Sequence, residues 1–447
     1  MTSVSTVEMP SGGSELRARA AEVAAELASR LADPERTASA VSTASATSTA
    51  SAASASSTSS AASAWSPLSL DGGHPGVALL FAELAHHDPA LRASAHAHLA
   101  AAAAHLPGPA ATALYHGVPA LAFAAHTARR TPQGYGGLFE RLDPVLDRAL
   151  RRALKGERDR LEQGRAGVPC SRYDLANGVT GLTRLLLSRR AEHHDTLAEA
   201  LSYLVRLARP LPVNGEPAPG WWSPSGPSGD PTPDPAYPRG HVNFGLAHGI
   251  SGPLAVLSAA LRAGVHVPGA RRAVAALARE LLAHRTGEGG WPALMPLERY
   301  GAAPPPPART AWCYGTPGTA VALFRAGQAL DRADLRRTAV EALAADLDHP
   351  RRVTDNALCH GRAGLLHICR VMAAESGSAR LAARGDALAA RLLADYDARR
   401  PYGYRFENGV ENRVGLLTGA AGIALSLHAY ATDARPASGW DAALLVS

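Results

Sequence analysis

Two cysteines and one histidine lie beside two similar glycine turns, and these residue types together can bind a metal. The stretch RTAWCYGTPG places Cys313 between the aromatic residues Trp312 and Tyr314, directly before a Gly-x-x-Gly turn. Cys359 and His360 precede a second turn of the same kind. Zinc takes cysteine sulfur and histidine nitrogen as ligands, and a catalytic zinc keeps one coordination position open. If the fold brings successive turns together, Cys313, Cys359 and His360 are candidate zinc ligands.

Three polar residues near related turns could add acid–base and anion-binding groups to such a site. Asp174 precedes one turn in YDLANGVTG, His248 precedes the next in LAHGISG, and Arg309 lies four residues before Cys313. A carboxylate, an imidazole and a guanidinium at one edge of a fold could deliver a proton and stabilise a developing anion. The alternative is that all these groups are structural, as buried cysteines, a capping histidine and polar turn residues.

The turns belong to a repeat that predicts how the candidate residues are positioned. They begin at residues 73, 117, 178, 249, 315, 361 and 419, and the second ends in alanine rather than glycine. An apolar helix is expected behind each turn, and amphipathic helices with charged faces are expected between them. This alternation predicts an all-α fold, a seven-fold α/α toroid of inner and outer helices with the turns at one end. An irregular helical array is the alternative.

Composition divides the chain into three parts. Residues 1–36 are predicted to form an N-terminal helix, and 37–66, almost wholly Ala, Ser and Thr, a flexible linker or loop. The toroid is predicted to occupy 67–447. Within it, the arginine-rich stretch 129–172 is a candidate insertion, and 210–241, rich in Pro, Gly and Ser, is predicted to be a long loop.

Charge and cysteine content exclude several classes of protein. The net charge of +6 is modest for 447 residues, and no basic block with interleaved aromatics indicates nucleic-acid binding. Four cysteines make no disulfide framework and favour a reducing compartment. Cys369 lies in an apolar helix and is predicted to be a core residue, while Cys170 is given no role. No signal peptide or membrane-spanning run is recognised, so a cytoplasmic protein is predicted.

From about residue 70 onward the chain resembles the lanthionine synthetase C-like, or LanC-like, family. The motifs that carry the resemblance are YDLANGVTG, NFGLAHGISG, RTAWCYGTPG, CHGRAGLL and GLLTGAAGIAL. It implies a seven-fold α/α toroid that binds one zinc ion. The residues implied are Cys313, Cys359 and His360 as zinc ligands, Asp174, His248 and Arg309 as catalytic residues, and Trp312 and Tyr314 as pocket residues.

The function implied by the resemblance is that of a zinc-dependent lanthipeptide cyclase. Cysteine thiols of a dehydrated precursor peptide would add to dehydroalanine or dehydrobutyrine and form (methyl)lanthionine thioether rings. The dehydratase and exporter of the same pathway are the further expected partners, and such a complex would bring the protein to a membrane surface. Three alternatives stay open: a non-cyclising LanC-like protein that binds or adds glutathione or another thiol, a peptide-docking scaffold, and an α/α-barrel glycosidase. The last usually needs two carboxylates, and the turns offer only Asp174.

Overall fold

The computed structural model of the chain describes residues 12–47, 65–106, 113–213, 215–229, 234–406 and 412–447. These residues are mostly helical, with four short strands. None of the described helices combines the length and the apolar character needed to cross a membrane.

Seven helices form a closed inner ring, each directly behind one of the seven turns. They are α3 (His74–Leu84), α5 (Val118–Ala128), α8 (Val179–Ser188), α10 (Ser251–Arg262), α12 (Thr316–Ala329), α14 (Arg362–Ser376) and α16 (Ala420–Thr432). Each packs against the next along the chain, and α16 packs against α3, so the ring closes. Nearly all side chains of these helices are buried, because protein surrounds them on all sides.

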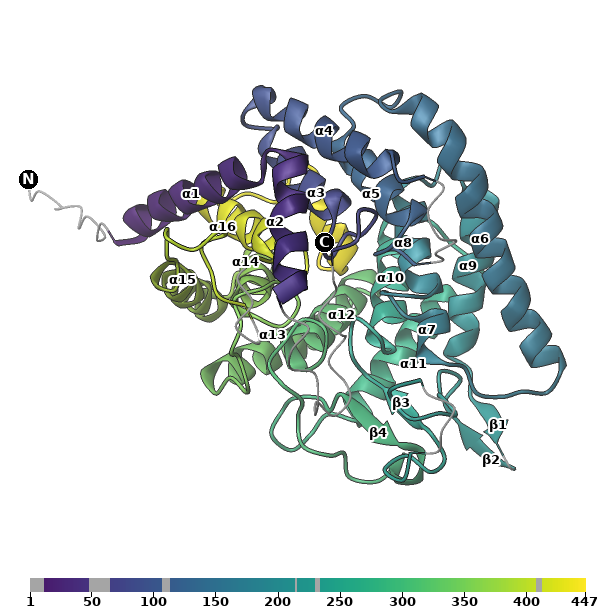
Figure 1. Cartoon of the computed structure of the whole chain (residues 1–447). Coiled ribbons are helices and arrows are strands. Elements are labelled where there is room, and N and C mark those ends of the chain that lie inside the picture. The colour runs from purple at the N-terminus through teal and green to yellow at the C-terminus, as the bar shows by residue number, and fades with distance from the viewer. Residues whose placement is uncertain (1–11, 48–64, 107–112, 214, 230–233, 407–411) are drawn as a thin grey trace, which may run out of the picture.

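The outer ring is made of amphipathic helices that cover the inner ones (Figure 1). They are α4 (Arg92–Ala103), α6 (Gly136–Glu162), α9 (His194–Leu207), α11 (Ala270–Ala283), α13 (Ala333–Asp348), α15 (Ala379–Ala394) and α1 (Gly12–Leu31). The short helices are η1 (Pro89–Leu91), α7 (Cys170–Tyr173), η2 (Leu297–Arg299) and η4 (Trp440–Leu444). Two rings of seven confirm the predicted all-α toroid.

Helix α1 belongs to the toroid, although the sequence analysis placed 1–36 outside it. It packs along α16 and is therefore the outer partner of the last inner helix. Val23, Leu27 and Leu31 on its inner face are completely buried. The N-terminal helix thus completes the outer ring at α16, which among the described residues is followed only by the short η4.

Part of the predicted linker 37–66 is helical, so that prediction is wrong for residues 37–47. They continue helix α2 (Pro34–Thr47), while 48–64 lie outside the described residues. Asp33 caps this helix by accepting the backbone N–H groups of Glu35 and Arg36 at 2.9 and 3.2 Å. A proline at the first helical position and many alanines, the best helix formers, then favour the helix.

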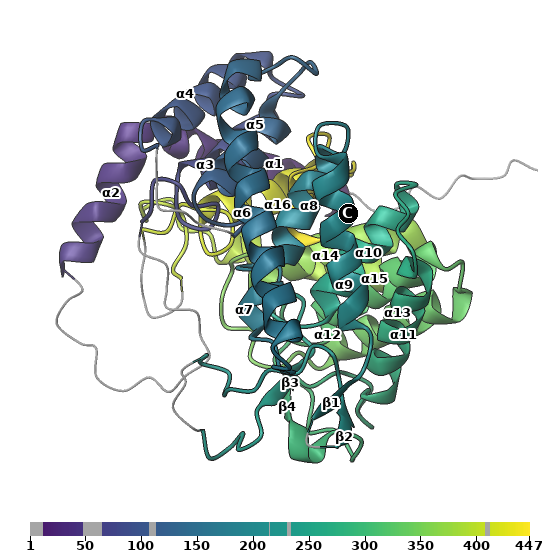
Figure 2. The same ribbon diagram turned by 90° about the vertical axis from the view of Figure 1, so that its right-hand side faces the viewer.

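The two stretches that interrupt the repeat have different structures. Most of 129–172, the candidate insertion, is the long helix α6, whose buried Leu142, Leu146 and Leu150 pack it into the outer ring beside α5 and α9 (Figure 2). It is therefore a regular outer helix rather than an insertion. The loop 210–241 is largely irregular, as predicted, but contains an antiparallel hairpin.

Four strands form two small antiparallel pairs beside the toroid. The hairpin pairs β1 (Leu211–Val213) with β2 (Glu216–Ala218), and β3 (His241–Asn243) pairs with β4 (Leu294–Pro296). Figures 1 and 2 both place the four strands together at the lower end of the molecule. They extend the body of the protein next to the third and fourth turns.

The turn that begins at Gly315 is tight enough to require glycine at both ends. Gly315 has φ +114°, a backbone conformation that only glycine adopts without strain. A Cβ at this position would lie 1.9 Å from the carbonyl oxygen of Arg309. A Cβ on Gly318 would lie 2.0 Å from the carbonyl oxygen of Trp312. The helix start thus folds directly onto the segment that carries Cys313.

The last residues of the chain lie inside the ring and contact several inner helices. The carbonyl oxygen of Ala443 accepts a hydrogen bond from the Tyr115 hydroxyl at 2.6 Å. That of Val446 accepts one from the buried Arg325 Nε at 2.9 Å. Because Trp440, Ala443 and Val446 are themselves fully buried, this segment fills the centre of the toroid.

Truncating a buried side chain of α1 tests whether this helix closes the ring. Leu27→Ala should lower the free energy of unfolding by about 2–5 kcal/mol, the usual cost of deleting a core leucine side chain. Leu425→Ala, in the neighbouring helix α16, should cost a similar amount. Glu22→Ala is the control: its side chain is 65% exposed, so the change should stay within about 0.5 kcal/mol. Urea unfolding followed by circular dichroism measures all three, and a neutral Leu27→Ala would contradict the assignment.

Candidate active site

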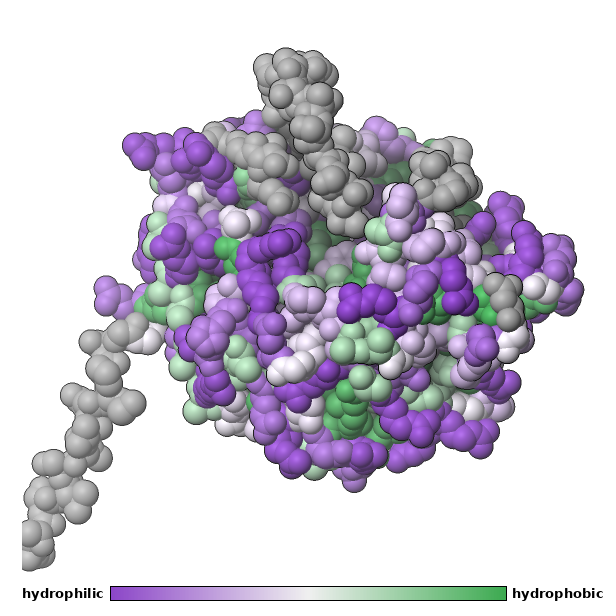
Figure 3. All heavy atoms as spheres, turned by 90° about the horizontal axis from the view of Figure 1, so that it is seen from below, coloured by the Kyte–Doolittle hydropathy of each residue, from purple (hydrophilic) through white to green (hydrophobic). Residues whose placement is uncertain are grey.

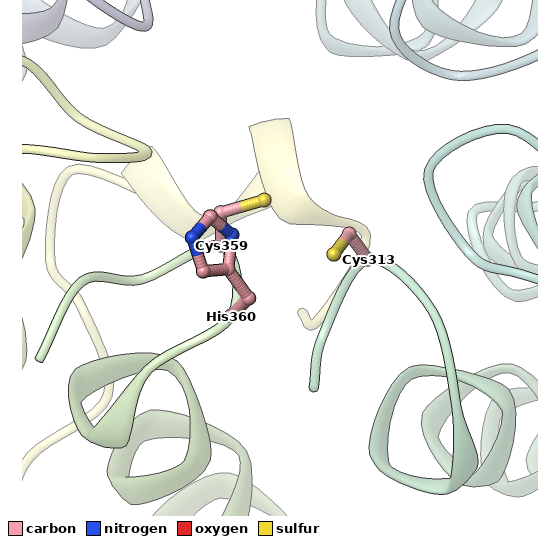
Figure 4. A group of neighbouring side chains, drawn as sticks. All are labelled: Cys313, Cys359 and His360. Carbon is pink, nitrogen blue, oxygen red and sulfur yellow. The ribbon is translucent and has the colours of Figure 1, made fainter. Parts of the chain in front are cut away.

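Cys313, Cys359 and His360 converge between two neighbouring turns. One ligand atom from each lies within 4.8 Å of the others. Figure 4 shows the three side chains facing the same space, Cys313 from one turn and the other two from the next. The two cysteines are only 8% and 9% exposed. The grouping that the sequence analysis expected is therefore present.

Backbone hydrogen bonds between turns hold these residues side by side. The N–H of Cys313 donates to the carbonyl oxygen of Cys359 at 3.2 Å, and the N–H of Cys359 donates to that of Leu417 at 2.8 Å. Cys313 and Cys359 occupy the same position, two residues before the first glycine of their turns. Equivalent positions on adjacent turns face each other, so the two sulfur atoms become neighbours.

The donor set fits a zinc ion with one open position. Ligand atoms of a tetrahedral Cys2His site lie roughly 3.5–3.8 Å apart, given Zn–S and Zn–N bonds of about 2.3 and 2.0 Å. A cluster within 4.8 Å is compatible with these lengths. His360 Nε2 lies 3.6 Å from Asp355 Oδ2, so a carboxylate stands beside the candidate histidine ligand. Such a carboxylate behind a histidine ligand commonly orients the ring.

The electrostatic surroundings favour a thiolate at this position. The hydrogen bond from the Cys359 thiol lowers the pKa of Cys313 well below its usual value. His360 and Arg309 act in the same direction on Cys313. Metal ligands must be deprotonated, so a site that already stabilises thiolate is suited to a cation.

His248 and Asp174 form a hydrogen-bonded pair. His248 Nδ1 donates to Asp174 Oδ2 at 2.7 Å, and the second carboxylate oxygen accepts the backbone N–H of Asn177 at 2.6 Å. Asp174 is nearly fully buried, whereas the side chain of His248 is 29% exposed. Burial by itself lowers the pKa of His248, but the hydrogen bond and the charge of Asp174 outweigh burial and raise it. With Nδ1 bound to Asp174, Nε2 is the nitrogen of His248 that can take part in proton transfer.

This pair is adjacent to the cluster of Cys313, Cys359 and His360. The N–H of Ala247, next to His248, donates to the carbonyl oxygen of Cys313 at 3.2 Å. The rings of His248 and Tyr314 lie 5.7 Å apart between centroids. Asn243 Nδ2 donates to the Tyr314 hydroxyl at 3.4 Å, and burial raises the pKa of that phenol. The dyad and the donor cluster thus belong to one site.

Arg309 and Trp312 take different places around Cys313. Arg309 is close enough to the cluster for its charge to help lower the pKa of Cys313. The hydrogen bond to Cys313 and burial raise the pKa of Cys359, and the charge of Arg309 only opposes that rise. Its buried Nε has no hydrogen-bond partner among the described residues, so a donor remains for an anion. Trp312 is 2% exposed, and its indole N–H donates to the carbonyl oxygen of Leu444 at 2.9 Å. It therefore supports Cys313 from inside the ring.

The remaining cysteines lie apart from the donor cluster. Cys369 is fully buried in α14, as predicted for a core residue. Cys170 lies 3.6 Å from His241 Nε2 and accepts a hydrogen bond from the Tyr173 hydroxyl at 3.4 Å. Burial raises the pKa of the Cys170 thiol to about 12. A thiol held neutral in this way competes poorly as a nucleophile.

The sequence analysis missed two supporting residues, Asp355 and Asn243. Asp355 lies five residues before His360, and Asn243 lies five residues before His248, at the start of the motif NFGLAHGISG. Each precedes a candidate residue within the same short segment, which is the signal that could have identified them. Neither has a distinctive spacing in the sequence, and the contact of Asn243 with Tyr314 joins two different turns.

Comparisons with known proteins identify the family and the fold that this chain shares. The profile of the family described as "Lanthionine synthetase C-like protein" matches residues 64–445. The "Nisin biosynthesis protein NisC" of Lactococcus lactis subsp. lactis is 23% identical over 318 residues, 68% of this chain and 73% of the relative. The solved structure "Nisin cyclase" has a TM-score of 0.72 and 21% sequence identity, over 85% of this chain and 92% of that one. This structural likeness shows the shared fold.

Removing single donors tests the metal site. The purified protein should hold about one zinc per chain. Cys313→Ala and Cys359→Ala should each lose most of it while keeping the helical circular dichroism signal, because the core of the toroid does not depend on the metal. Cys369→Ala, which removes a buried thiol outside the cluster, is the matched control and should keep its zinc. Elemental analysis of the folded variants measures the zinc content per chain. Full zinc retention in both Cys313→Ala and Cys359→Ala would refute the metal site.

Proposed function

The chain belongs to the lanthionine synthetase C-like family, and from this membership we propose that it is a zinc-dependent lanthipeptide cyclase. The observation that carries the proposal is the placement of the Cys313, Cys359 and His360 donors directly beside the His248–Asp174 pair. Thiol activation and proton delivery are the two operations that thioether formation requires, and the site has separate residues for each. The substrate is a ribosomally made peptide that carries cysteine and dehydrated Ser or Thr.

Cys313, Cys359 and His360 would hold the zinc ion. When bound, the ion supplies an open coordination position at which a substrate thiol ionises to the nucleophilic thiolate. Asp355, 3.6 Å from His360 Nε2, would orient the ring of this ligand. The low exposure of both cysteines excludes water from the donor side, which strengthens every charge interaction there.

His248 is assigned as the acid that completes the addition. Attack of sulfur on the β-carbon of a dehydro residue forms the carbon–sulfur bond and leaves an enolate, whose α-carbon needs a proton. His248 binds Asp174 through Nδ1, so Nε2–H is free to point to the substrate. The raised pKa of His248 keeps it protonated for this step at neutral pH more fully than an ordinary histidine.

Arg309 is assigned to the enolate oxygen. Its buried Nε lacks a protein partner among the described residues, and a buried donor without a partner is costly unless a ligand satisfies it. A guanidinium is always charged and stabilises a developing oxyanion without losing its proton. Tyr314, held by Asn243 beside His248, forms the wall against which the substrate would lie.

The alternatives use the same site differently. A protein that adds glutathione or another small thiol would need the same metal and acid, so the reacting thiol must be identified by experiment. A docking scaffold would need neither His248 nor Arg309. For a glycosidase, Asp174 is poorly placed, because its carboxylate is buried and occupied by His248 and Asn177. On the same grounds we propose that the protein acts in the cytoplasm, together with the dehydratase and the exporter of the pathway.

The proposed function can be tested by measuring the mass and the free-thiol content of the substrate peptide in one sample. A dehydrated peptide with one cysteine, incubated with the zinc-loaded protein, should lose its free thiol while its mass stays constant, because cyclisation is an isomerisation. In the presence of glutathione the same result is expected. A mass increase by one glutathione would instead show the non-cyclising activity, and an unchanged thiol count with bound peptide would show a scaffold.

The same assay tests whether His248 is the residue that delivers the proton. His248→Asn should keep zinc but consume thiol roughly 10²–10⁴-fold more slowly, the usual worth of general acid catalysis. His266→Asn, an exposed histidine after α10, is the control and should react at the wild-type rate. Wild-type speed in His248→Asn would show that another group delivers the proton, and loss of zinc would make His248 a fourth ligand.

The pH dependence of the rate tests the His248–Asp174 pair. The acid is the imidazolium form, so activity should fall as pH rises through the pKa of His248. Asp174 raises that pKa, and Asp174→Asn removes the raising charge. The alkaline limb of the rate profile should therefore move to lower pH in Asp174→Asn. A limb that stays in place, measured with zinc content held equal, would contradict the pairing.

A further inference from the structure

Two neighbouring hollows lie between the outer ring and the hairpin β1–β2, away from the metal donors. The first encloses about 590 Å³ between the end of α6, residues 164–172 and Trp222. The second encloses about 240 Å³ between α9 and residues 209–211. The nearby strands lie at the end of the molecule seen in Figure 3, where hydrophilic side chains surround smaller hydrophobic patches.

Arg160 separates the two hollows and gives them a fixed shape. It lines both, and its guanidinium donates to the carbonyl oxygens of Ala166 and Gly167, each at 2.9 Å. Its Nε donates to Glu157 at 3.0 Å, so its charge is matched inside the protein. The site is therefore built by a buried ion pair rather than by loose surface side chains.

Positive charge dominates the lining of both hollows. Arg165 and Arg172 line the first, and Arg206 and Arg209 line the second. All four are exposed, and none forms an ion pair with a residue in the described part of the chain. Glu157, already bound to Arg160, is the one carboxylate among the lining residues that the structure describes. The hollows thus present four available guanidiniums.

The walls between these charges are apolar. Pro212, Val213, Trp222 and Pro224 line the first hollow. The packing behind them is tight, since a Cβ on Gly167 would lie 2.7 Å from Pro224 and 2.9 Å from Trp222. Trp222 is held by its indole N–H, which donates to the carbonyl oxygen of Arg239 at 2.7 Å. Guanidiniums around an apolar wall suit a ligand that carries carboxylates next to apolar side chains.

One wall of the first hollow leads directly to the catalytic pair. Arg172 is followed by Tyr173, which is fully buried, and then by Asp174, the partner of His248. A peptide held in the hollow therefore lies beside the segment that ends in the active site. Extended chain covers about 3.3–3.6 Å per residue, so a peptide can occupy the hollow and reach the reacting centre together.

We propose that the Arg160-centred hollows bind an acidic, partly apolar segment of the substrate peptide, outside the part that reacts. The proposal rests on the proposed function for the identity of the ligand as a peptide, and it deepens that function by naming what holds the substrate. A peptide fits better than a nucleic acid, because the four charges surround apolar hollows rather than a continuous ridge that could follow a phosphate backbone.

Direct binding tests this without any turnover. The probe is a fluorescein-labelled twelve-residue peptide of alternating glutamate, leucine and serine, compared with its lysine-for-glutamate counterpart and a twelve-nucleotide single strand. In fluorescence anisotropy the zinc-loaded protein should bind the acidic probe, and added salt should weaken binding. Arg165→Glu/Arg209→Glu, with one change in each hollow, should weaken it about tenfold or more, because two attractive charges become repulsive.

Arg148→Glu/Arg152→Glu is the matched control, with the same charge change at exposed positions of α6 outside the hollows. It should bind the acidic probe like the wild type, and all proteins should keep their zinc. Equal loss in both double variants, or no binding by the wild type, would overturn the proposal. Tighter binding of the oligonucleotide, lost in Arg165→Glu/Arg209→Glu, would also overturn it and identify a nucleic-acid site. If wild-type protein fails to consume peptide thiols, the proposed function fails while this binding result stands.

Discussion

The active site depends on backbone hydrogen bonds that run from turn to turn around the toroid. Leu70 donates to Tyr115 at 2.9 Å and accepts from Leu416 at 3.2 Å, which joins the first turn to the second and the last. Ala247 donates to Cys313, and Cys313 to Cys359, each at 3.2 Å. Because of these bonds, residues at the same position of neighbouring turns lie as close together as residues on hydrogen-bonded strands. Their side chains therefore become neighbours at this end of the toroid.

Closure of the ring makes this arrangement rigid. The inner helices contact one another in sequence, and α1 from the start of the chain covers α16 from its end. The segment that includes η4 fills the centre and fixes two residues next to the turns, Tyr115 and Trp312, through its carbonyl oxygens. Both N- and C-terminal parts of the chain thus support the metal donors, although neither contains one.

Neighbouring turns of the site have opposite electrostatic effects: one stabilises a thiolate and the other stabilises a protonated imidazole. Around Cys313 the structure favours negative charge, since the hydrogen bond from Cys359, with help from His360 and Arg309, lowers the pKa of its thiol. Around His248 it favours positive charge, because Asp174 raises the pKa of the imidazole above its usual value. A nucleophile and an acid can therefore coexist at one pH without neutralising each other. That combination suits an addition that ends with proton delivery.

Local sequence was sufficient to predict the repeat, the all-α toroid and the residues that converge, because glycine spacing and apolar periodicity are short-range signals. It also showed that Cys313, Cys359 and His360 precede equivalent turns. It could not show that α1 completes the outer ring, that most of 129–172 is an ordinary outer helix, or that residues 37–47 are helical. Those outcomes, with the roles of Asp355 and Asn243 and the arginine-lined hollows, depend on contacts between distant segments. These contacts form only when the ring closes, because closure determines which turns and which helices become neighbours.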